Sequence, residues 1–166
     1  AMLVGFESGS SRLLKFMRKG TTRQINAAAA ALAKRLGIFV QANMMFGLPT
    51  ETKEEVEMSI DMIQNSLDGF VICPSIFTPY PGSDLAKICE DKGWNTVRDS
   101  YDYQRGAGGR KLKELEAFGY TYDWLYKRLN DEGIYKSVVD EYTHIPLKNL
   151  AEQQDPAYAG YMSPGA

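Results

Sequence analysis

The side chains best suited to chemistry lie at the ends of three short apolar segments. Glu7 ends the first, Asn43 lies near the end of the second and is followed by Gly47, and residues 77–83 ("FTPYPGS") follow the third. A carboxylate accepts hydrogen bonds from hydroxyls, an amide donates and accepts them, and a glycine lets a flat ring approach the backbone. Lys19 could pair with a carboxylate. Together these groups would suit a ribose diol, an adenine ring and a carboxylate.

Each of these residues also has a purely structural interpretation. Glu7 could cap the following helix, Lys19 could be a favourable charge at a helix C-terminus, and Asn43 could be a satisfied polar group in a sheet. "GLPTET" (47–52) lacks the glycine spacing and the Lys-Ser/Thr ending of a phosphate loop. "PYPGS" (79–83) could be a tight turn, so no element is specific alone.

The segments that would position these residues alternate between strand and helix. Because parallel strands joined by helical crossovers end at the same edge of a sheet, the three strand ends are expected to converge on one face. Three strands are too few to close a barrel, so a half-barrel or small open sheet is expected. Strands are predicted at 2–8, 38–46 and 69–83, and helices at 11–20, 23–36, 53–67 and 84–93.

Local signals set the helix boundaries and faces. Gly20 is expected to end the first helix, Thr21 or Thr22 to cap the second, and Thr52 with Glu55 to form a capping box. Helical spacing predicts two apolar faces, the first made of Ile25, Ala29, Leu32 and Leu36 and the second of Val56, Ile60, Ile63 and Leu67.

The segment 38–46 has two different faces. One is apolar throughout and is expected to face helices, whereas the other contains amides and would face a barrel interior near its open end. The apolar set is Val40, Ala42, Met44 and Phe46, and the mixed set is Phe39, Gln41, Asn43 and Met45. Pro74 in the third strand predicts an edge, a bulge or a late strand boundary.

Composition limits the function classes. The 166 residues suggest one domain with a real core, and a net charge of −2 does not indicate binding to nucleic acid or to an anionic membrane. No apolar run could span a bilayer, and no signal peptide is recognised. Cys73 and Cys89 indicate reduced core thiols of a cytosolic protein, and His144 a surface histidine. The strand-like residues 2–6 at the start favour a fragment.

The character changes after residue 93. Residues 98–114 are polar and glycine-rich and predict a loop, and residues 118–142 are aromatic and amphipathic and predict one or two helices broken near Gly133. Residues 151–166 have turn formers and no periodicity, so a loose tail is expected. We expect two regions, 1–93 and a helical extension at 94–166.

Three motifs in order, "GFESGSSRLLKFMRKGTT" (5–22), "ANMMFGLPTET" (42–52) and "PYPGSDLAK" (79–87), resemble the second half of a radical S-adenosylmethionine core. The resemblance is to cobalamin-binding members and methylthiotransferases, and covers about residues 2–93. It implies a partial (β/α)₆ barrel of which this chain holds the fourth to sixth strands.

The resemblance also implies roles for individual residues. Glu7 and Asn43 match ribose-binding positions, and Lys19 matches a residue that meets the methionyl carboxylate. Met45 and Gly47 match the apolar residue and glycine near the adenine. The sixth strand would offer backbone to the adenine edge around Phe77 and Thr78.

The departure from this family is the absence of its CxxxCxxC motif and of the first three strands. Cys73 and Cys89 cannot replace three closely spaced thiolates that hold a 4Fe-4S cluster. The chain alone is therefore expected to be inactive, with the whole protein an enzyme that forms a 5′-deoxyadenosyl radical or, with cobalamin, transfers methyl groups. The missing N-terminal half would be its partner, and its substrate is unknown.

Two alternatives stay open. The chain could be a non-catalytic binding or assembly module that self-associates, as a homodimer, through its exposed strand edges and apolar inner face. An unrelated nucleotide-binding α/β domain is disfavoured because no phosphate-binding loop is present.

Overall fold

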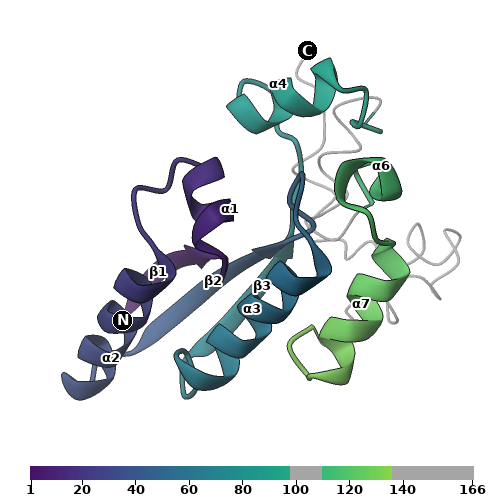
Figure 1. The fold of residues 1–166 in the computed structure, drawn as a ribbon. Coiled ribbons are helices and arrows are strands. Elements are labelled where there is room, and N and C mark those ends of the chain that lie inside the picture. The colour runs from purple at the N-terminus through teal and green to yellow at the C-terminus, as the bar shows by residue number, and fades with distance from the viewer. Residues whose placement is uncertain (98–109, 136–166) are drawn as a thin grey trace, which may run out of the picture. The chain divides into compact units, whose positions relative to one another are not determined.

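The computed structural model describes residues 1–97 and 110–135 (Figure 1). Three strands and six helices lie in these ranges. Four of the sequence predictions fall outside them: the loop residues 98–109, the end of the helical segment 118–142, His144 and the tail 151–166. The elements are β1 (Met2–Glu7), α1 (Ser11–Phe16), α2 (Arg23–Arg35), β2 (Val40–Phe46), α3 (Lys53–Asn65), β3 (Val71–Ile76), α4 (Asp84–Asp91), α6 (Glu114–Phe118) and α7 (Tyr122–Asp131).

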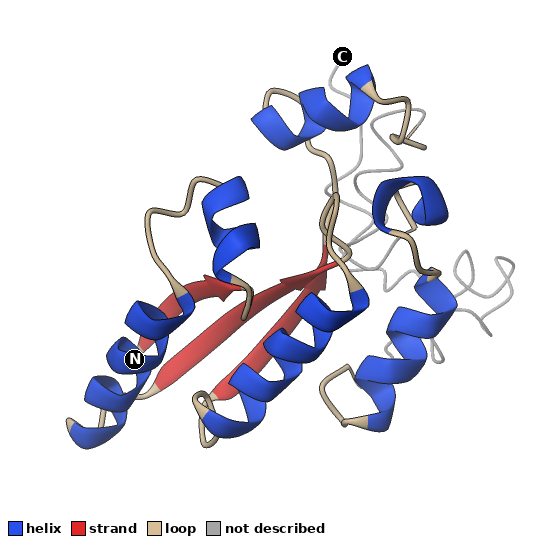
Figure 2. Ribbon diagram, viewed as in Figure 1, coloured by secondary structure: helices blue, strands red, loops and turns tan. Residues whose placement is uncertain are grey.

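The strands form an open parallel sheet in the order β1-β2-β3. Helices α2 and α3 run alongside the strands, and α4 lies beyond their carboxyl ends (Figure 2). The predicted α/β class, with three parallel strands, flanking helices and a helical C-terminal region, is confirmed. Pro74 lies in β3, an edge strand of this sheet, where the missing N–H of proline is tolerated.

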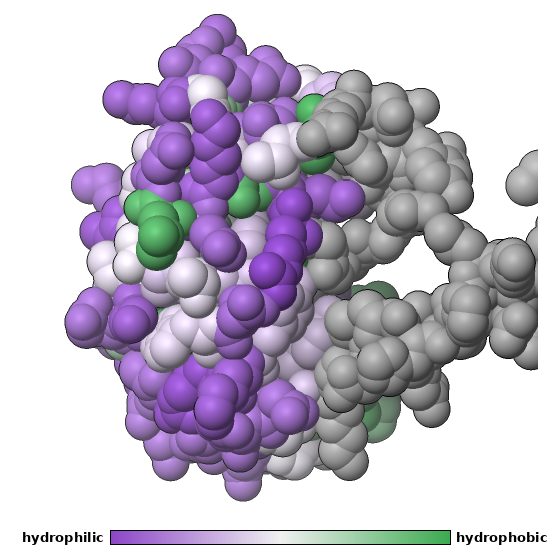
Figure 3. Space-filling model, turned by 90° about the vertical axis from the view of Figure 1, so that its right-hand side faces the viewer, coloured by the Kyte–Doolittle hydropathy of each residue, from purple (hydrophilic) through white to green (hydrophobic). Residues whose placement is uncertain are grey.

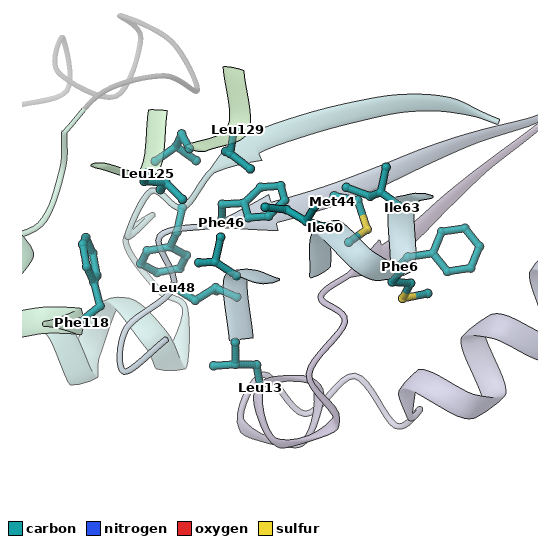
Figure 4. Packing of buried hydrophobic residues seen from close by; sticks show 14 of the residues in the cluster. Phe6, Leu13, Met44, Phe46, Leu48, Ile60, Ile63, Phe118, Leu125 and Leu129 are labelled. Atoms are coloured by element: carbon teal, nitrogen blue, oxygen red, sulfur yellow. The ribbon is translucent and has the colours of Figure 1, made fainter. Parts of the chain in front are cut away.

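The two faces of β2 differ as predicted. Val40, Ala42, Met44 and Phe46 are all buried, whereas Gln41, Asn43 and Met45 are half-buried. The buried face contributes to a core with side chains from α3, the β2–α3 loop and α7 (Figure 4). The other face of the sheet brings Gly5, Asn43 and Cys73 side by side in register.

Helix α3 follows its sequence signals closely. The Thr52 hydroxyl accepts from the Glu55 N–H at 3.3 Å, and the Glu55 carboxylate accepts from the Thr52 N–H at 3.1 Å, which completes the capping box. The predicted apolar face of Val56, Ile60, Ile63 and Leu67 is buried. Thr22 caps α2 through its hydroxyl alone, which accepts from the Ile25 N–H at 3.3 Å.

The predicted apolar face of α2 is wrong as a core face in this chain. Ile25, Leu32 and Leu36 are 59%, 45% and 62% exposed, and the buried residues of α2 are instead Asn26 and Ala30. The Asn26 amide donates to the Phe6 carbonyl at 3.3 Å, so a polar side chain fixes α2 to β1. Helical spacing therefore identified an apolar stripe on α2, but no other described residue covers it.

Helix α1 ends earlier than predicted, at Phe16 rather than near Gly20. Arg18 takes the left-handed backbone conformation with φ 57°, and the Lys19 N–H donates to the Leu14 carbonyl at 3.0 Å. This is the hydrogen bond of a Schellman ending, which glycine usually makes possible. The result turns Lys19 back toward the end of β1.

The C-terminal helices break at Gly119 (φ 68°), between α6 and α7, and Gly133 follows the end of α7. The two helices and the segment between them add buried side chains to the same core as the sheet: Ala117, Phe118, Tyr120, Tyr122, Leu125 and Leu129. The Arg128 guanidinium binds Glu57 of α3 through two hydrogen bonds of 2.7 and 2.8 Å. The face turned to the viewer in Figure 3 is mostly hydrophilic among the described residues.

The two cysteines differ. Cys89 is buried as predicted, and burial raises the pKa of its thiol to about 11, so it stays protonated. Cys73 is only half-buried and lies on the open face of the sheet rather than in the core.

Candidate functional site

A cavity of about 500 Å³ lies at the carboxyl ends of the three strands. This volume is within the range of small-molecule sites. Five predicted site residues line it: Glu7, Lys19, Met45, Phe77 and Thr78. The floor is mainly apolar and includes Met17, Ile76 and Leu85.

Glu7 reaches the cavity through an unusual backbone conformation. The register of β1 on β2 shifts between Gly5 and Glu7, and Glu7 has φ 63°. A side chain at Gly5 would place its Cβ 2.4 Å from Glu7 Oε1. Gly5 therefore makes room for the carboxylate, and sequence reasoning had no signal for this role.

Lys19 pairs with Glu7, since its Nζ lies 3.0 Å from Glu7 Oε1. The two side chains are 35% and 17% exposed, so the pair is reachable from the cavity. One member is an acceptor suited to hydroxyls and the other a cation suited to a carboxylate. A polar ligand could therefore bind both the Glu7 carboxylate and the Lys19 ammonium group above the apolar floor.

Phe77 and Thr78 continue from the end of β3. The Phe77 N–H donates to the Phe46 carbonyl at 2.8 Å, which fixes the exit of β3 to the exit of β2. The Thr78 hydroxyl is buried and finds no hydrogen-bond partner among the described residues, which is costly for a polar group. Across the rim, Arg18 pairs with Asp84 at the start of α4.

Asn43 and Gly47 lie outside the cavity lining. Asn43 is on the open sheet face between Gly5 and Cys73. Gly47 has φ 68°, a conformation that favours glycine, and a Cβ there would lie against Ile76 and helix α7. The structure thus brings five of the seven predicted residues together, and the ligand roles of all seven stay predictions.

Sequence reasoning missed Glu51, which is wholly buried behind this site. Its Oε2 accepts from the Gly47 N–H at 2.7 Å and from the Tyr120 hydroxyl at 2.7 Å, and its Oε1 has no partner within residues 1–97 and 110–135. Burial raises the pKa of Glu51 to about 7, although these hydrogen bonds oppose the rise. The carboxyl therefore titrates near neutral pH.

Glu55 behaves in the opposite way. Burial disfavours its ionisation, but hydrogen bonds from Arg12 (2.8 Å) and from the Ser10 hydroxyl (2.6 Å) outweigh burial and lower its pKa. Arg12 also donates to the Thr50 carbonyl at 2.7 Å. This cluster joins α1, the β2–α3 loop and α3 behind the cavity.

The described residues contain no group of three or more His, Cys, Asp or Glu side chains that could hold a metal ion. Two cysteines cannot supply the three thiolates of a CxxxCxxC cluster site, so these residues do not fit such a cluster. No helix in the described ranges is long and apolar enough to cross a membrane.

Comparison with known proteins finds partial similarity to proteins named as methyltransferases and to one named as a methylthiotransferase. The chain is 41% identical over 81 residues to an uncharacterised methyltransferase of Pyrococcus horikoshii, which covers 49% of this chain and 17% of that protein. It is 38% identical over 88 residues to a provisionally named methylthiotransferase of Methanocaldococcus jannaschii (52% and 19%). It is 29% identical over 121 residues to bacteriochlorophyllide d C-12(1)-methyltransferase of Chlorobaculum tepidum (68% and 26%).

The chain is similar to proteins named methyltransferases and methylthiotransferases. It spans about a fifth of the length of these relatives. No family model matches the sequence.

Proposed function

We propose that this chain is the C-terminal half of a radical S-adenosylmethionine barrel, from a methyl- or methylthiotransferase that works in the cytoplasm. In this proposal residues 1–93 form the barrel half and residues 94–166 the helical extension. The observation that carries it is the cavity at the carboxyl ends of the parallel strands, with the Glu7–Lys19 pair above an apolar floor. The names of the relatives support the transferase class.

The residues fit S-adenosylmethionine. Glu7 would accept hydrogen bonds from the ribose hydroxyls, and Lys19 would donate to the methionyl carboxylate. Met45 would contact the adenine, and Phe77 and Thr78 would offer their backbone to its edge. Asn43 would reach the ribose from the open sheet face, with Gly47 nearby at the end of β2.

The residues of this chain do not fit an iron–sulfur cluster, so we assign that group to the missing N-terminal half. A reduced 4Fe-4S cluster there would supply the electron that cleaves S-adenosylmethionine. The chain alone would then bind the nucleoside and methionine moieties without reacting them. Cobalamin in the whole protein is a proposal that rests on the resemblance alone.

The unpaired edge of β1 supports a missing N-terminal half that would pair with it. In the described sheet, β1 pairs only with β2, and the stripe of Ile25, Leu32 and Leu36 on α2 is exposed. A further parallel strand and helix would satisfy the edge and bury this stripe.

The gene, sequenced for about a domain's length before Ala1, tests the proposal, because an in-frame CxxxCxxC is expected there. An upstream region without these cysteines would overturn the cluster assignment.

Binding provides the second test. Titration of the ¹⁵N-labelled chain with S-adenosylmethionine should shift the amide signals of Glu7, Met45 and Phe77. Glu7→Ala and Asn43→Ala should each weaken this binding, whereas Glu90→Ala, an exposed control on α4, should not. Unchanged affinity in both site variants would refute the site assignment.

The non-catalytic alternative makes a different prediction for the same edge. If the module assembles through β1 and the α2 stripe, light scattering should show a homodimer, and Leu32→Ser should dissociate it. A monomer at high concentration would count against self-association.

A further inference from the structure

The β2–α3 loop, residues 47–52, is assembled around one buried carboxylate. Glu51 Oε2 accepts from the Gly47 N–H, more weakly from the Leu48 N–H (3.4 Å), and from the Tyr120 hydroxyl. The first two donors belong to the loop itself. The third comes from the segment between α6 and α7, 69 residues away in the chain.

A second contact ties the same loop to α6. The Thr50 N–H donates to the Ala117 carbonyl at 2.8 Å, and Thr50 has φ 67°, which is strained for a β-branched residue. Arg12 holds Thr50 from the other side. A strained conformation persists only where its surroundings hold it, so the helical segment helps to fix the loop.

The loop is directly continuous with the cavity. Gly47 follows Phe46, whose carbonyl accepts from the N–H of Phe77, and Phe77 and Met45 line the cavity. A change in the Gly47 backbone would therefore move the Phe46 carbonyl and, through it, the Phe77 amide. Tyr120 is connected to the cavity by Glu51, Gly47 and Phe46, in that order.

We propose that Tyr120 is a positioning residue: through Glu51 it sets the backbone of the β2 exit and thereby the shape of the cavity at Phe77. The helical segment around Tyr120 thus supports the site from behind rather than covering its mouth. The effect on ligand binding rests on the proposed function, whereas the coupling of Tyr120 to Phe77 does not.

The protonation of Glu51 offers a way to observe this coupling. The groups that act on it are Glu55 of α3, which raises its pKa, and Tyr120, whose hydrogen bond lowers it. Arg12 of α1 also interacts with the Glu51 charge, and Tyr122 of α7 acts on Tyr120.

Amide NMR of the ¹⁵N-labelled chain without ligand tests the coupling. Between about pH 5 and pH 8, the Gly47 and Phe77 amides should titrate together with the midpoint of Glu51. Tyr120→Phe removes a donor to the carboxylate and should raise this midpoint by about one pH unit. Glu51→Gln keeps an acceptor for Tyr120 and Gly47 and should abolish the titration at both amides.

Tyr122→Phe is the matched control. This buried tyrosine also loses a hydrogen bond, from the Leu112 N–H at 3.1 Å, but it makes no bond to Glu51. It should leave the midpoint unchanged. A Phe77 amide that does not follow Gly47, or a midpoint equal in wild type and Tyr120→Phe, would overturn the proposal.

Adenosine, which has no group titrating in this pH range, tests the consequence for binding. Tyr120→Phe should weaken adenosine binding by about tenfold, because it removes a hydrogen bond to a charged group and part of the lost stabilisation is felt at the cavity. Tyr122→Phe should leave adenosine binding unchanged. If wild type shows no adenosine shifts, the proposed function fails, but the ligand-free titration still decides the coupling. If wild type binds and Tyr120→Phe binds equally well, the positioning role fails.

Discussion

Glu51 should make the folded chain less stable as the pH rises toward neutrality. Its pKa is raised from 4.5 to about 7 by burial, so the folded state holds a proton that the unfolded state has already released. Between these two values the folded state binds more protons, and the free energy of unfolding therefore falls with increasing pH. Below about pH 4.5 both states are protonated, and the effect disappears.

The size follows from the two pKa values. The folded and unfolded pKa values of Glu51 are about 7 and 4.5. At about 1.4 kcal/mol per pH unit, this difference lowers the free energy of unfolding by about 3 kcal/mol. That is a large fraction of the 5 to 15 kcal/mol, roughly, that holds a domain of this kind folded. Glu51→Gln keeps acceptors for Gly47 and Tyr120 but cannot ionise, so the variant should lack this dependence.

Urea denaturation of wild type and Glu51→Gln across this pH range provides the measurement. The difference in unfolding free energy, wild type minus variant, should fall by about 3 kcal/mol from pH 4.5 to pH 8. Other titrating groups cancel because both chains carry them. Glu55→Gln is the control: the pKa of Glu55 is lowered, so its contribution is lost only as the pH falls below 4.5. A wild-type minus Glu51→Gln difference that stays constant would refute the argument.

Four further substitutions test other parts of the structure by urea denaturation. Gly9→Ala should cost about 3 kcal/mol or prevent folding, because its Cβ would lie 2.1 Å from the Met58 carbonyl oxygen, and full stability would refute this contact. Thr78→Val should not reduce stability, since the buried hydroxyl has no partner, whereas Ser83→Ala removes the cap of α4 and should cost about 1 kcal/mol. Leu125→Ala in the core should cost about 2 to 5 kcal/mol, and a smaller loss would contradict its full burial.

The sequence predicted those features whose causes are local. The capping box of Thr52 and Glu55 involves four consecutive residues, and the alternation in β2 follows from strand geometry, so both could be recognised without a structure. Pro74 indicated an edge, a bulge or a late strand boundary for the same reason, since a missing N–H is a property of one residue, and the first of these is found.

Features that depend on distant partners could not be predicted. Helical spacing identifies the stripe of Ile25, Leu32 and Leu36 but cannot say whether another element covers it. The early end of α1 requires Arg18 to adopt a conformation that glycine usually takes, which composition does not indicate. Glu51 looks like one more polar loop residue until Tyr120 is placed beside it.

Among the candidate site residues, Lys19 joins the cavity from the turn after α1, whereas the convergence of Glu7 and Met45 followed from parallel topology, because strand ends meet at one edge. The exact path of Glu7 did not, since it depends on the register shift after Gly5. Asn43 shows the limit of strand phase alone, because it shares the open face of β2 with Met45 but lies two residues earlier, outside the cavity lining.

The distance along the chain between Glu51 and Tyr120 has a consequence during synthesis. At about 5 to 20 residues per second, a ribosome needs roughly 3 to 14 s to add the 69 residues that separate them. All three strands are complete before Tyr120 is made. For those seconds the nascent sheet carries a loop whose carboxylate lacks its third donor, so the β2 exit reaches its final conformation only when the C-terminal helices emerge.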